Sequence, residues 1–449
     1  MAPLYFPKAP WYALPALFLF LIGCSSSTQF YRAVEEDIGA GHYAEAIKGV
    51  VEHRDAYGTK SSVLYKLDLG LLYHYAGMTD SSSAYLLAAE REIEDLYTKS
   101  VALEAISMLL NDNVLPYDGE DFERVLVNVF LALNFAQEGL PDEAIVEARK
   151  VDLKLREFAR QYEGKNTFQE DAFARYLAGA LYESGAELND AFISYKKAHE
   201  AYETYAATYG TKAPPFLLND LVRMAKRLSF TDEYDAYRRL GGTDTAAVRG
   251  MQGSVIVVAY AGRAPIKTEI RPNVSIPDSA GVIHTFQIAL PKFTPRMRAG
   301  RAYDVAVRIP GDSVASVAVR TTVAEDITAI ANQCLEDRLA LVYLKSGGRA
   351  LLKFLAAEAA KSKLKEKSES EIVNILGSLA IDLAVGATEQ ADVRSWRTLP
   401  AQIQIARLEL AAGSYEFSIT ATDNSFRIPS ERVAVKPDKV TFVIIDDVR

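Results

Sequence analysis

The stretch LALNFAQEGLPDEAIVEARKV, residues 131–151, decides how the first half of this chain folds. Apolar and small residues recur in it at intervals of three and four, which is the period of an amphipathic helix. Gly139 interrupts the period where a left-handed backbone can end a helix, and Pro141 follows where a helix can begin. Ala144 and Ala148 are small enough to let two helices cross closely. The stretch therefore predicts two helices joined by a tight turn.

The same spacing recurs between residues 29 and 245, which read almost wholly as helix. In each copy a small residue and an aromatic precede a turn residue, and small residues of a second helix follow. This resembles the tetratricopeptide helix–turn–helix unit. The alternative is a non-repetitive helical bundle that uses small residues at its crossings. The matching positions are Leu69, Gly70, Tyr73, Gly77, Leu86 and Ala89 in one copy, Ala178, Gly179, Tyr182, Ala186, Ala191, Tyr195 and Ala198 in another, and Gly41, Tyr43, Ala46 and Ile47 in a partial copy.

After Gly241 and Gly242 the apolar period shortens to two, which predicts β-strands. Residues 310–313 and 411–413 have the composition of turns between neighbouring strands. Between two sets of strands, residues 324–390 return to a helical pattern. Each strand set alone is too small for a stable sandwich, so we predict one β-sandwich with a helical insertion. The predicted strands are 253–260, 285–290, 303–309, 314–323, 402–410, 414–422, 431–435 and 440–445.

The amino-terminal residues have the layout of an export signal. Lys8 precedes an apolar run over residues 11–22. A run of about a dozen residues is too short for a bilayer span, which needs about 20. Leu21-Ile22-Gly23-Cys24 resembles the lipobox of bacterial lipoproteins, in which the cysteine receives a diacylglycerol and the chain is cut before it. The resemblance implies lipid on Cys24 and, because Ser25 follows, an outer-membrane location with the body facing the periplasm. The alternative is an uncleaved signal or a buried apolar segment with an incidental cysteine.

Longer segments extend this resemblance. GEDFERVLVNVFLALNF at residues 119–135, DEAIVEARKVD at 142–152 and FQEDAFARYLAG at 168–179 are similar to a family of uncharacterised bacterial outer-membrane lipoproteins with tetratricopeptide-like repeats. The resemblance covers the signal, the helical half and, more loosely, the end of the chain. It implies the architecture and carries over no activity.

These patterns together predict an α+β, multidomain chain. Residues 1–23 would be a lipoprotein signal peptide, residues 24–245 an all-α tetratricopeptide-like solenoid, and residues 250–449 a β-sandwich interrupted by the insertion at 324–390. The charge distribution supports this division, because residues 24–249 carry 24 basic and 37 acidic residues, whereas residues 250–449 carry 25 and 22. The acidic first half argues against a nucleic-acid partner, which needs a basic footprint.

No pattern of a catalytic, metal or cofactor site stands out. The five histidines lack a metal-binding spacing, and neither a phosphate-binding loop nor a dinucleotide fingerprint occurs. The acids around Gly119 lack the ligand spacing of a calcium loop and fit a helix start better. Residues 311–315 lack the last glycine of a nucleophile elbow, and Cys334 lies in an apolar helical pattern that favours a core position. We therefore expect no catalytic residue, metal or cofactor, with an envelope hydrolase as the enzymatic alternative.

Arg394, Trp396 and Arg397 lie where the insertion meets the second strand set. A tryptophan between two arginines can hold an anionic ligand such as a glycan acid or a phosphate. The interpretation that we favour is a wedge, in which Trp396 is buried between insertion and sandwich and the arginines pair with nearby acids. The first possibility supports an alternative function, that of a glycan-binding or envelope-processing protein with its site at this junction.

The function that the sequence favours is a membrane-anchored periplasmic scaffold or adaptor that binds an envelope protein or peptide. Tetratricopeptide-like solenoids expose a continuous groove lined mainly by the first helix of each unit. The acidic balance of the helical half suits a neutral or basic partner segment. The repeat register places four polar or amphipathic side chains on the groove face, where they would contact the partner: His74, Gln137, Tyr176 and Glu183.

Overall fold

The fold comes from a computed structural model of the chain. The structure describes residues 23–107, 113, 115–161, 168, 170–244, 252–277, 283–296, 301–312, 315–339, 342 and 390–448. The predicted signal peptide, the boundary between residues 245 and 250 and most of the predicted insertion lie outside these residues and stay predictions. No helix among the described residues is long and apolar enough to cross a membrane.

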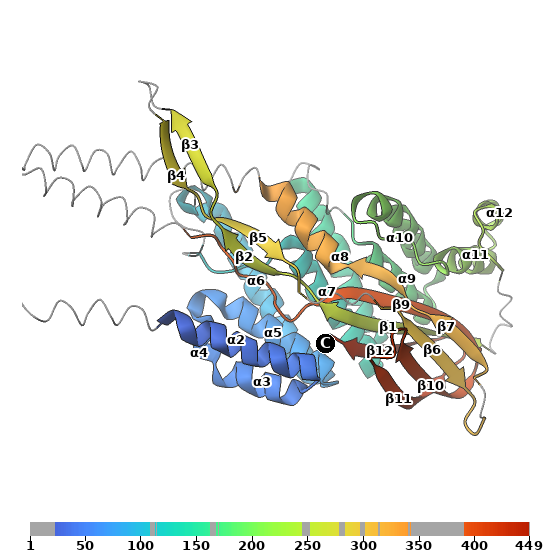
Figure 1. The fold of residues 1–449 in the computed structure, drawn as a ribbon. Coiled ribbons are helices and arrows are strands. Elements are labelled where there is room, and N and C mark those ends of the chain that lie inside the picture. The colour runs from blue at the N-terminus through green and yellow to red at the C-terminus, as the bar shows by residue number, and fades with distance from the viewer. Residues whose placement is uncertain are drawn as a thin grey trace, which may run out of the picture.

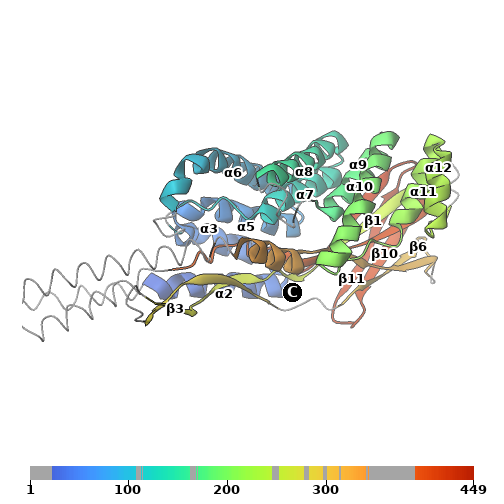
Figure 2. The ribbon, with the colours of Figure 1, turned by 90° about the horizontal axis from the view of Figure 1, so that it is seen from above.

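Helices make up the first half of the chain, from α2 (Gly23–Ala40) to α12 (Thr231–Arg239). Each helix packs on the next along the chain, as in a helical repeat array (Figure 2). The intervening elements are α3 (Tyr43–Glu52), α4 (Arg54–Tyr57), η2 (Thr59–Ser61), α5 (Ser62–Tyr75), α6 (Thr79–Ser107), α7 (Asp121–Glu138), α8 (Pro141–Gln161), α9 (Ala172–Ser184), α10 (Leu188–Thr208) and α11 (Leu217–Leu228).

The turns and crossings of these helices lie where the repeat pattern predicts them. The backbone is left-handed at the four predicted turn positions, with φ of 75° at Gly41, 68° at Gly77, 74° at Gly139 and 63° at Ala186. At the α9–α10 crossing, a Cβ on Gly179 would lie 2.6 Å from Cδ1 of Tyr195. The α5–α6 crossing has the same geometry, with Gly70 against Leu86. The repeat interpretation is therefore confirmed at the level of helix pairs.

Strands make up the second half of the described chain. They form an inner sheet in the order β12-β1-β9-β8, an outer sheet in the order β11-β10-β6-β7, and two ribbons, β2-β5 and β3-β4. The strands are β1 (Gln252–Arg263), β2 (Ile266–Ile270), β3 (Asn273–Pro277), β4 (Ile283–Gln287), β5 (Leu290–Thr294), β6 (Tyr303–Arg308), β7 (Val317–Arg320), β8 (Thr322–Asp326), β9 (Pro400–Ala411), β10 (Gly413–Ala421), β11 (Arg427–Val435) and β12 (Val440–Asp447).

Strands from both sides of the insertion share each sheet. In the inner sheet β1 and β8 both pair with β9, and in the outer sheet β6 pairs with β10. The prediction of one interrupted β-sandwich is thus confirmed. Several details differ from the sequence-based expectation. The single strand predicted at 314–323 is divided into β7 of the outer sheet and β8 of the inner sheet. The strand β8 continues to Asp326, so the helix that follows begins at residue 327 instead of 324. The single strand predicted at 285–290 is replaced by parts of β4 and β5, which belong to the two ribbons.

The inner sheet lies between the helices and the outer sheet (Figure 1). Alternate side chains of β1, such as Ile256 and Val258, join the core shared with the helices. Their neighbours, such as Val255 and Val257, pack toward the outer sheet. Because both faces are covered, β1 is buried continuously from residue 253 to 262, which accounts for its unbroken apolar sequence.

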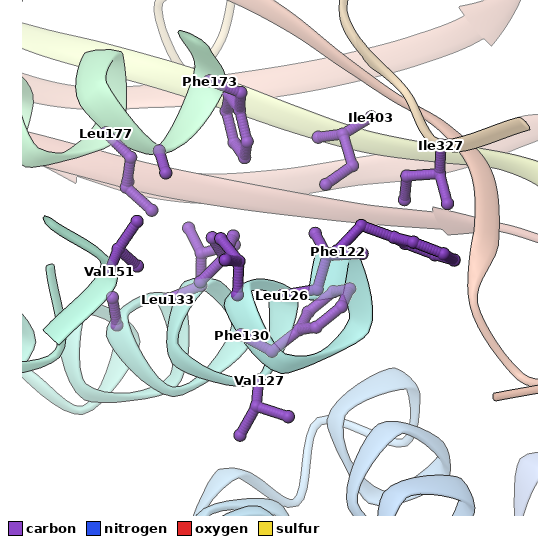
Figure 3. Packing of buried hydrophobic residues seen from close by; sticks show 14 of the residues in the cluster. Phe122, Leu126, Val127, Phe130, Leu133, Val151, Phe173, Leu177, Ile327 and Ile403 are labelled. Carbon is purple, nitrogen blue, oxygen red and sulfur yellow. The ribbon is translucent and has the colours of Figure 1, made fainter. Parts of the chain in front are cut away.

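The helix α7 contributes most to the core between helices and inner sheet. All its residues from Asp121 to Asn134 are buried. Figure 3 shows Phe122, Leu126 and Phe130 of this helix below Ile403 of β9. Its start is a capping box, in which Oε2 of Glu123 accepts a hydrogen bond from the backbone N–H of Glu120. The acids around Gly119 therefore begin a helix, as the sequence favoured.

Candidate functional site

The inner sheet occupies the face on which the sequence placed an open groove. His74, Tyr176 and Glu183 do point to that face, as the repeat register predicts, but all three are buried. Each contacts the chain's own strands: His74 lies 2.8 Å (Nε2 to hydroxyl) from Tyr260 of β1, and the other two contact Arg407 of β9. Gln137 is exposed and lies outside this interface. The expectation of a groove open to a partner is therefore wrong for three of the four residues.

Arg407 is the centre of a buried polar cluster between helices and inner sheet. Its guanidinium donates hydrogen bonds to Glu183 at 2.9 Å, to the Tyr195 hydroxyl at 2.9 Å and to Ser254 at 2.7 Å. It also lies 3.2 Å from a carboxylate oxygen of Asp220 on α11. This one side chain therefore connects α9, α10 and α11 to β1 and β9.

A second arginine adds a positive charge to this cluster. Arg223 of α11 donates to Asp220 at 2.7 Å and to both carboxylate oxygens of Glu183. Arg407 additionally donates to Glu409 at 3.0 Å. Two guanidinium groups thus face three carboxylates. Except for the Glu409 side chain, which is 22% exposed, these side chains are 8% exposed or less.

Burial changes the protonation of the cluster. It raises the pKa of Asp220 to about 7, although Arg407 acts against this shift. Burial and the neighbouring Arg407 lower the pKa of Arg223 to about 9. Burial also acts to raise the pKa of Glu409, but the two guanidinium groups outweigh it and the pKa is lowered. The cluster is therefore held together by mutual charge pairing in a low-dielectric interior.

A cleft of about 160 Å³ opens beside this cluster. Its charged residues are already paired: Lys226 with Asp244 at 2.7 Å, and Lys439 with the Ser184 carbonyl at 2.7 Å. Four acidic and four basic side chains line the wall, so the cleft has no net charge to attract an ionic ligand. The lining residues are Glu183, Arg223, Lys226, Arg227, Asp244, Gln252, Gly253, Ser254, Glu409, Asp438 and Lys439.

His74 belongs to a second buried polar group. The Asn134 side chain donates from Nδ2 to Ser82 at 2.8 Å, so its oxygen accepts the hydrogen bond from Nδ1 of His74. Nε2 of His74 then accepts from the Tyr260 hydroxyl. Burial lowers the pKa of His74 to about 4, and the imidazole is neutral at physiological pH. This arrangement leaves His74 no free nitrogen for a partner or a metal.

The junction of insertion and sandwich is also closed. Trp396 is 1% exposed, its ring lies 5.8 Å from that of Phe130, and its Nε1 donates to Thr398 at 2.8 Å. Arg394 pairs with Asp392 at 2.7 Å. The burial that the wedge interpretation requires is therefore present, although the ring packs on Phe130 of α7 and most of the insertion lies outside the described residues. At this exposure the ring has no open face for a glycan.

Arg397, Glu123 and Glu120 complete that junction. Arg397 of the linker pairs with Glu35 of α2 at 2.7 Å. Glu123 accepts hydrogen bonds from the Trp396 backbone at 2.8 Å and the Tyr117 hydroxyl at 2.5 Å. Burial and the neighbouring Glu120 raise the pKa of Glu123 to about 7. Burial also acts to raise the pKa of Glu120, but its ion pairs with Lys267 and Arg338 lower it to about 2. These contacts hold the ribbon β2-β5 and the helix over residues 327–339 against the start of α7.

The sequence reasoning missed Arg407, Asp220, Arg223 and Tyr260. The available signal was a polar residue inside an apolar element: Arg407 interrupts Ile405-Ala406 and Leu408 in a buried strand. A buried charge in such a strand needs a partner from another element. Among the described residues no group of three or more His, Cys, Asp or Glu side chains is placed to hold a metal ion.

The helix pairs and the sheets described above define the class coarsely, as a chain with tetratricopeptide-like helical repeats followed by a β-rich region. No protein-family model matches the sequence, and no curated protein matches it. Among solved structures, MamA of AMB-1 is similar at 16% identity over 49% of this chain and 94% of that chain, with a TM-score of 0.30. A protein described as a kinesin light chain of Podosopora anserina, with nearly identical TPR-like repeats, is similar at 12% identity over 49% and 97%, also with a TM-score of 0.30. Similarity at this level does not assign a fold or a role to this chain, so the repeat assignment depends on the helix pairs described above.

Proposed function

We propose that this chain is a lipoprotein of the bacterial outer membrane that serves as a rigid periplasmic scaffold for another envelope protein. Lipid on Cys24 would hold it on the membrane. The observation that carries the proposal is the lipobox, Leu21-Ile22-Gly23-Cys24, whose last two residues begin a helix that is part of the folded body. Two or three acyl chains on one residue hold a protein on a membrane far more firmly than one chain does.

The position of Cys24 would keep the body close to the lipid. It lies in the first turn of α2, and Phe30 of the same helix is already a buried core residue. Six residues of helix span about 9 Å, about half the reach of an extended chain. Glu35, further along α2, pairs with Arg397 near the sandwich. The anchored helix is therefore continuous with both halves of the molecule.

The buried cluster around Arg407 favours a scaffold function over a catalytic one. Its charged groups are used in joining the repeats to the inner sheet, and the adjoining cleft is lined by equal numbers of acidic and basic side chains. A solenoid whose inner face is filled in this way is a preorganised body, and binding to a preorganised surface costs little conformational entropy. A partner would be held on surfaces outside the groove.

Metabolic labelling with an alkyne analogue of palmitate tests the anchor. The parent chain should take up label and fractionate with the outer membrane of a Gram-negative host, whereas Cys24→Ala should take up none and lose that location. Cys334→Ala is the matched control, because Cys334 is the other cysteine of the chain and is buried in the core. Label on Cys24→Ala, or an unchanged location, would show the anchor to be wrong.

Cross-linking in intact cells tests the scaffold separately. The anchored chain should be joined reproducibly to the same few envelope proteins, and these products should disappear with Cys24→Ala. If the labelled, membrane-bound chain forms no such product, the scaffold proposal fails while the anchor stands.

A further inference from the structure

The strand β12 (Val440–Asp447) forms an open edge of the inner sheet. The other edges of the two four-stranded sheets are protected in ways that natural sheets use against unwanted pairing. The strand β7 has only four residues, β11 contains Pro429, and β8 runs directly into the helix over 327–339. By contrast, β12 has eight residues, contains no proline and pairs with β1 without interruption.

The register of β12 shows which of its backbone groups are unpaired. In the parallel pairing Ser254 is opposite Val440, and the Ser254 N–H donates to the Lys439 carbonyl at 2.9 Å. Both backbone groups of an extended residue point to one side, and successive residues alternate. Lys439 and every second residue after it therefore face β1. The residues of β12 that face outward are Val440, Phe442, Ile444 and Asp446.

Contacts at the start of the strand agree with this register. The Val440 N–H points away from β1 and donates to Oγ of Ser184, at the end of α9, at 3.4 Å. The side chain of Ser184 thus occupies the edge beside Val440. From Phe442 onward no strand among the described residues pairs with this side of β12. The free segment is therefore the part from Phe442 to Asp446.

The side chains of the free segment indicate what would fit beside it. Phe442 and Ile444 are partly buried against the core shared with the helices. Asp446 follows on the same face, near the hydroxyl groups of Tyr75 and Tyr260. Its buried Oδ1 atom has no hydrogen-bond partner among the described residues, and burial raises the pKa of this carboxyl well above its usual range. An unpartnered buried carboxyl is costly and would be relieved by a cationic group.

We propose that β12 binds an extended segment of a partner protein, which adds to the inner sheet beside Phe442 and Ile444 and places a lysine or arginine at Asp446. The inference rests on the proposed scaffold function and names the surface that would hold the partner. Main-chain hydrogen bonds supply affinity in such strand addition, and alternate side chains supply specificity. The acidic helical half of the molecule also favours a basic segment.

A second copy of this chain fits the edge poorly. In a two-fold antiparallel pairing centred on Ile444, Asp446 would face Phe442 of the other copy and gain no cation. In a two-fold pairing centred on Val443, Asp446 of one copy would lie opposite Val440 of the other, where Ser184 already occupies the edge. Neither register satisfies the carboxyl, so the partner segment is favoured over self-association.

The test uses the purified full chain in detergent and a phage-displayed library of random octapeptides as the probe. We expect enrichment of peptides that alternate apolar residues and carry one basic residue at a fixed position. Ile444→Pro removes an outward N–H and spares the hydrogen bonds to β1, so it should weaken the binding of the enriched peptides at least about tenfold. Ala318→Pro is the matched control, because Ala318 is exposed in the edge β7 and its N–H also points away from the neighbouring strand, and it should leave binding unchanged. Asp446→Asn should remove the preference for the basic residue.

Hydrogen exchange provides a measurement that does not depend on the proline variant folding. In the parent chain the Phe442, Ile444 and Asp446 amides should exchange quickly and become protected when an enriched peptide binds. The proposal is overturned if no peptide is enriched, if peptides protect another segment, or if Ile444→Pro and the parent bind equally. It is also overturned if the chain dimerises through β12. Since these measurements need no membrane, a failed anchor would not affect them.

Discussion

Replacing Arg407 with methionine tests whether buried charges fasten the helical repeats to the inner sheet. The Arg407 side chain is 2% exposed, and Glu183 and Asp220 beside it are 6% and 4% exposed. Methionine fills much of the same volume but leaves both carboxylates with Arg223 alone. Removal of one partner from a buried ion pair costs about 3–5 kcal/mol, because the remaining charge stays buried. We expect a loss of that size in the free energy of unfolding at pH 8, measured by denaturant titration.

The loss should depend on pH in a defined direction. Asp220 has a pKa raised from 3.8 to about 7, and Arg407 opposes this shift. Without Arg407 the pKa of Asp220 rises further, so below pH 6 the carboxyl is protonated and no longer an unpaired charge. A group with a raised folded-state pKa contributes its stability at low pH and loses it as pH rises through that pKa. The penalty of Arg407→Met should therefore be smaller at pH 5 than at pH 8.

An exposed arginine in a strand provides the matched control. Arg432 of β11 pairs with Glu416 at 3.5 Å, and its side chain is 74% exposed. Arg432→Met should change the free energy of unfolding by less than about 1 kcal/mol, as is usual for surface pairs. A loss below about 1 kcal/mol for Arg407→Met at pH 8, or a penalty independent of pH, would refute the reasoning.

Two further predictions concern packing and titration. Gly179→Ala would place a Cβ 2.6 Å from the Tyr195 ring and should lower the free energy of unfolding by about 1–3 kcal/mol. In the control Gly39→Ala on α2, the Cβ meets only the end of the Arg263 side chain at 3.9 Å, so this variant should be neutral or stabilising. Equal effects of the two substitutions in thermal unfolding would contradict the crossing geometry. Burial and Glu120 raise the pKa of Glu123 to about 7. The free energy of unfolding of the parent should therefore fall between pH 4.5 and 7, relative to that of Glu123→Gln, by on the order of 3 kcal/mol. Parallel pH profiles in denaturant titrations would show that Glu123 does not titrate in this range.

The sequence allowed the helix pairs and the interrupted sandwich to be predicted because both depend on local periodicity. Gly139, Pro141 and the small residues at the crossings specify turns and close contacts within a single hairpin. The insertion was predictable from a count of strands, since neither set alone could close a sandwich. The ribbons β2-β5 and β3-β4 were not predicted, because short strands away from the main sheets carry little alternation.

The location of the candidate site depended on contacts that periodicity does not reveal. The repeat register correctly turned His74 and Tyr176 toward the inner face. It gave no indication that β1 and β9, which lie more than 150 residues further along the chain, would fill that face. The unbroken apolar sequence of β1 was the one clue, because a strand with both faces buried needs a second layer on its far side.

The polar contacts across the interface also limit how this solenoid can act. Apolar packing alone tolerates a shift of the sheet against the helices, whereas hydrogen bonds at fixed positions do not. Such positions lie along the length of the sheet, from Arg407 with Glu183, through Tyr260 with His74, to the Tyr75 hydroxyl on the Thr398 carbonyl at 3.0 Å. A partner that entered the groove would have to break all of them and leave buried charges unpaired, at a cost larger than most interfaces recover. We therefore expect recognition at the rim, where β12 offers an unpaired row of backbone groups at the edge of the inner sheet.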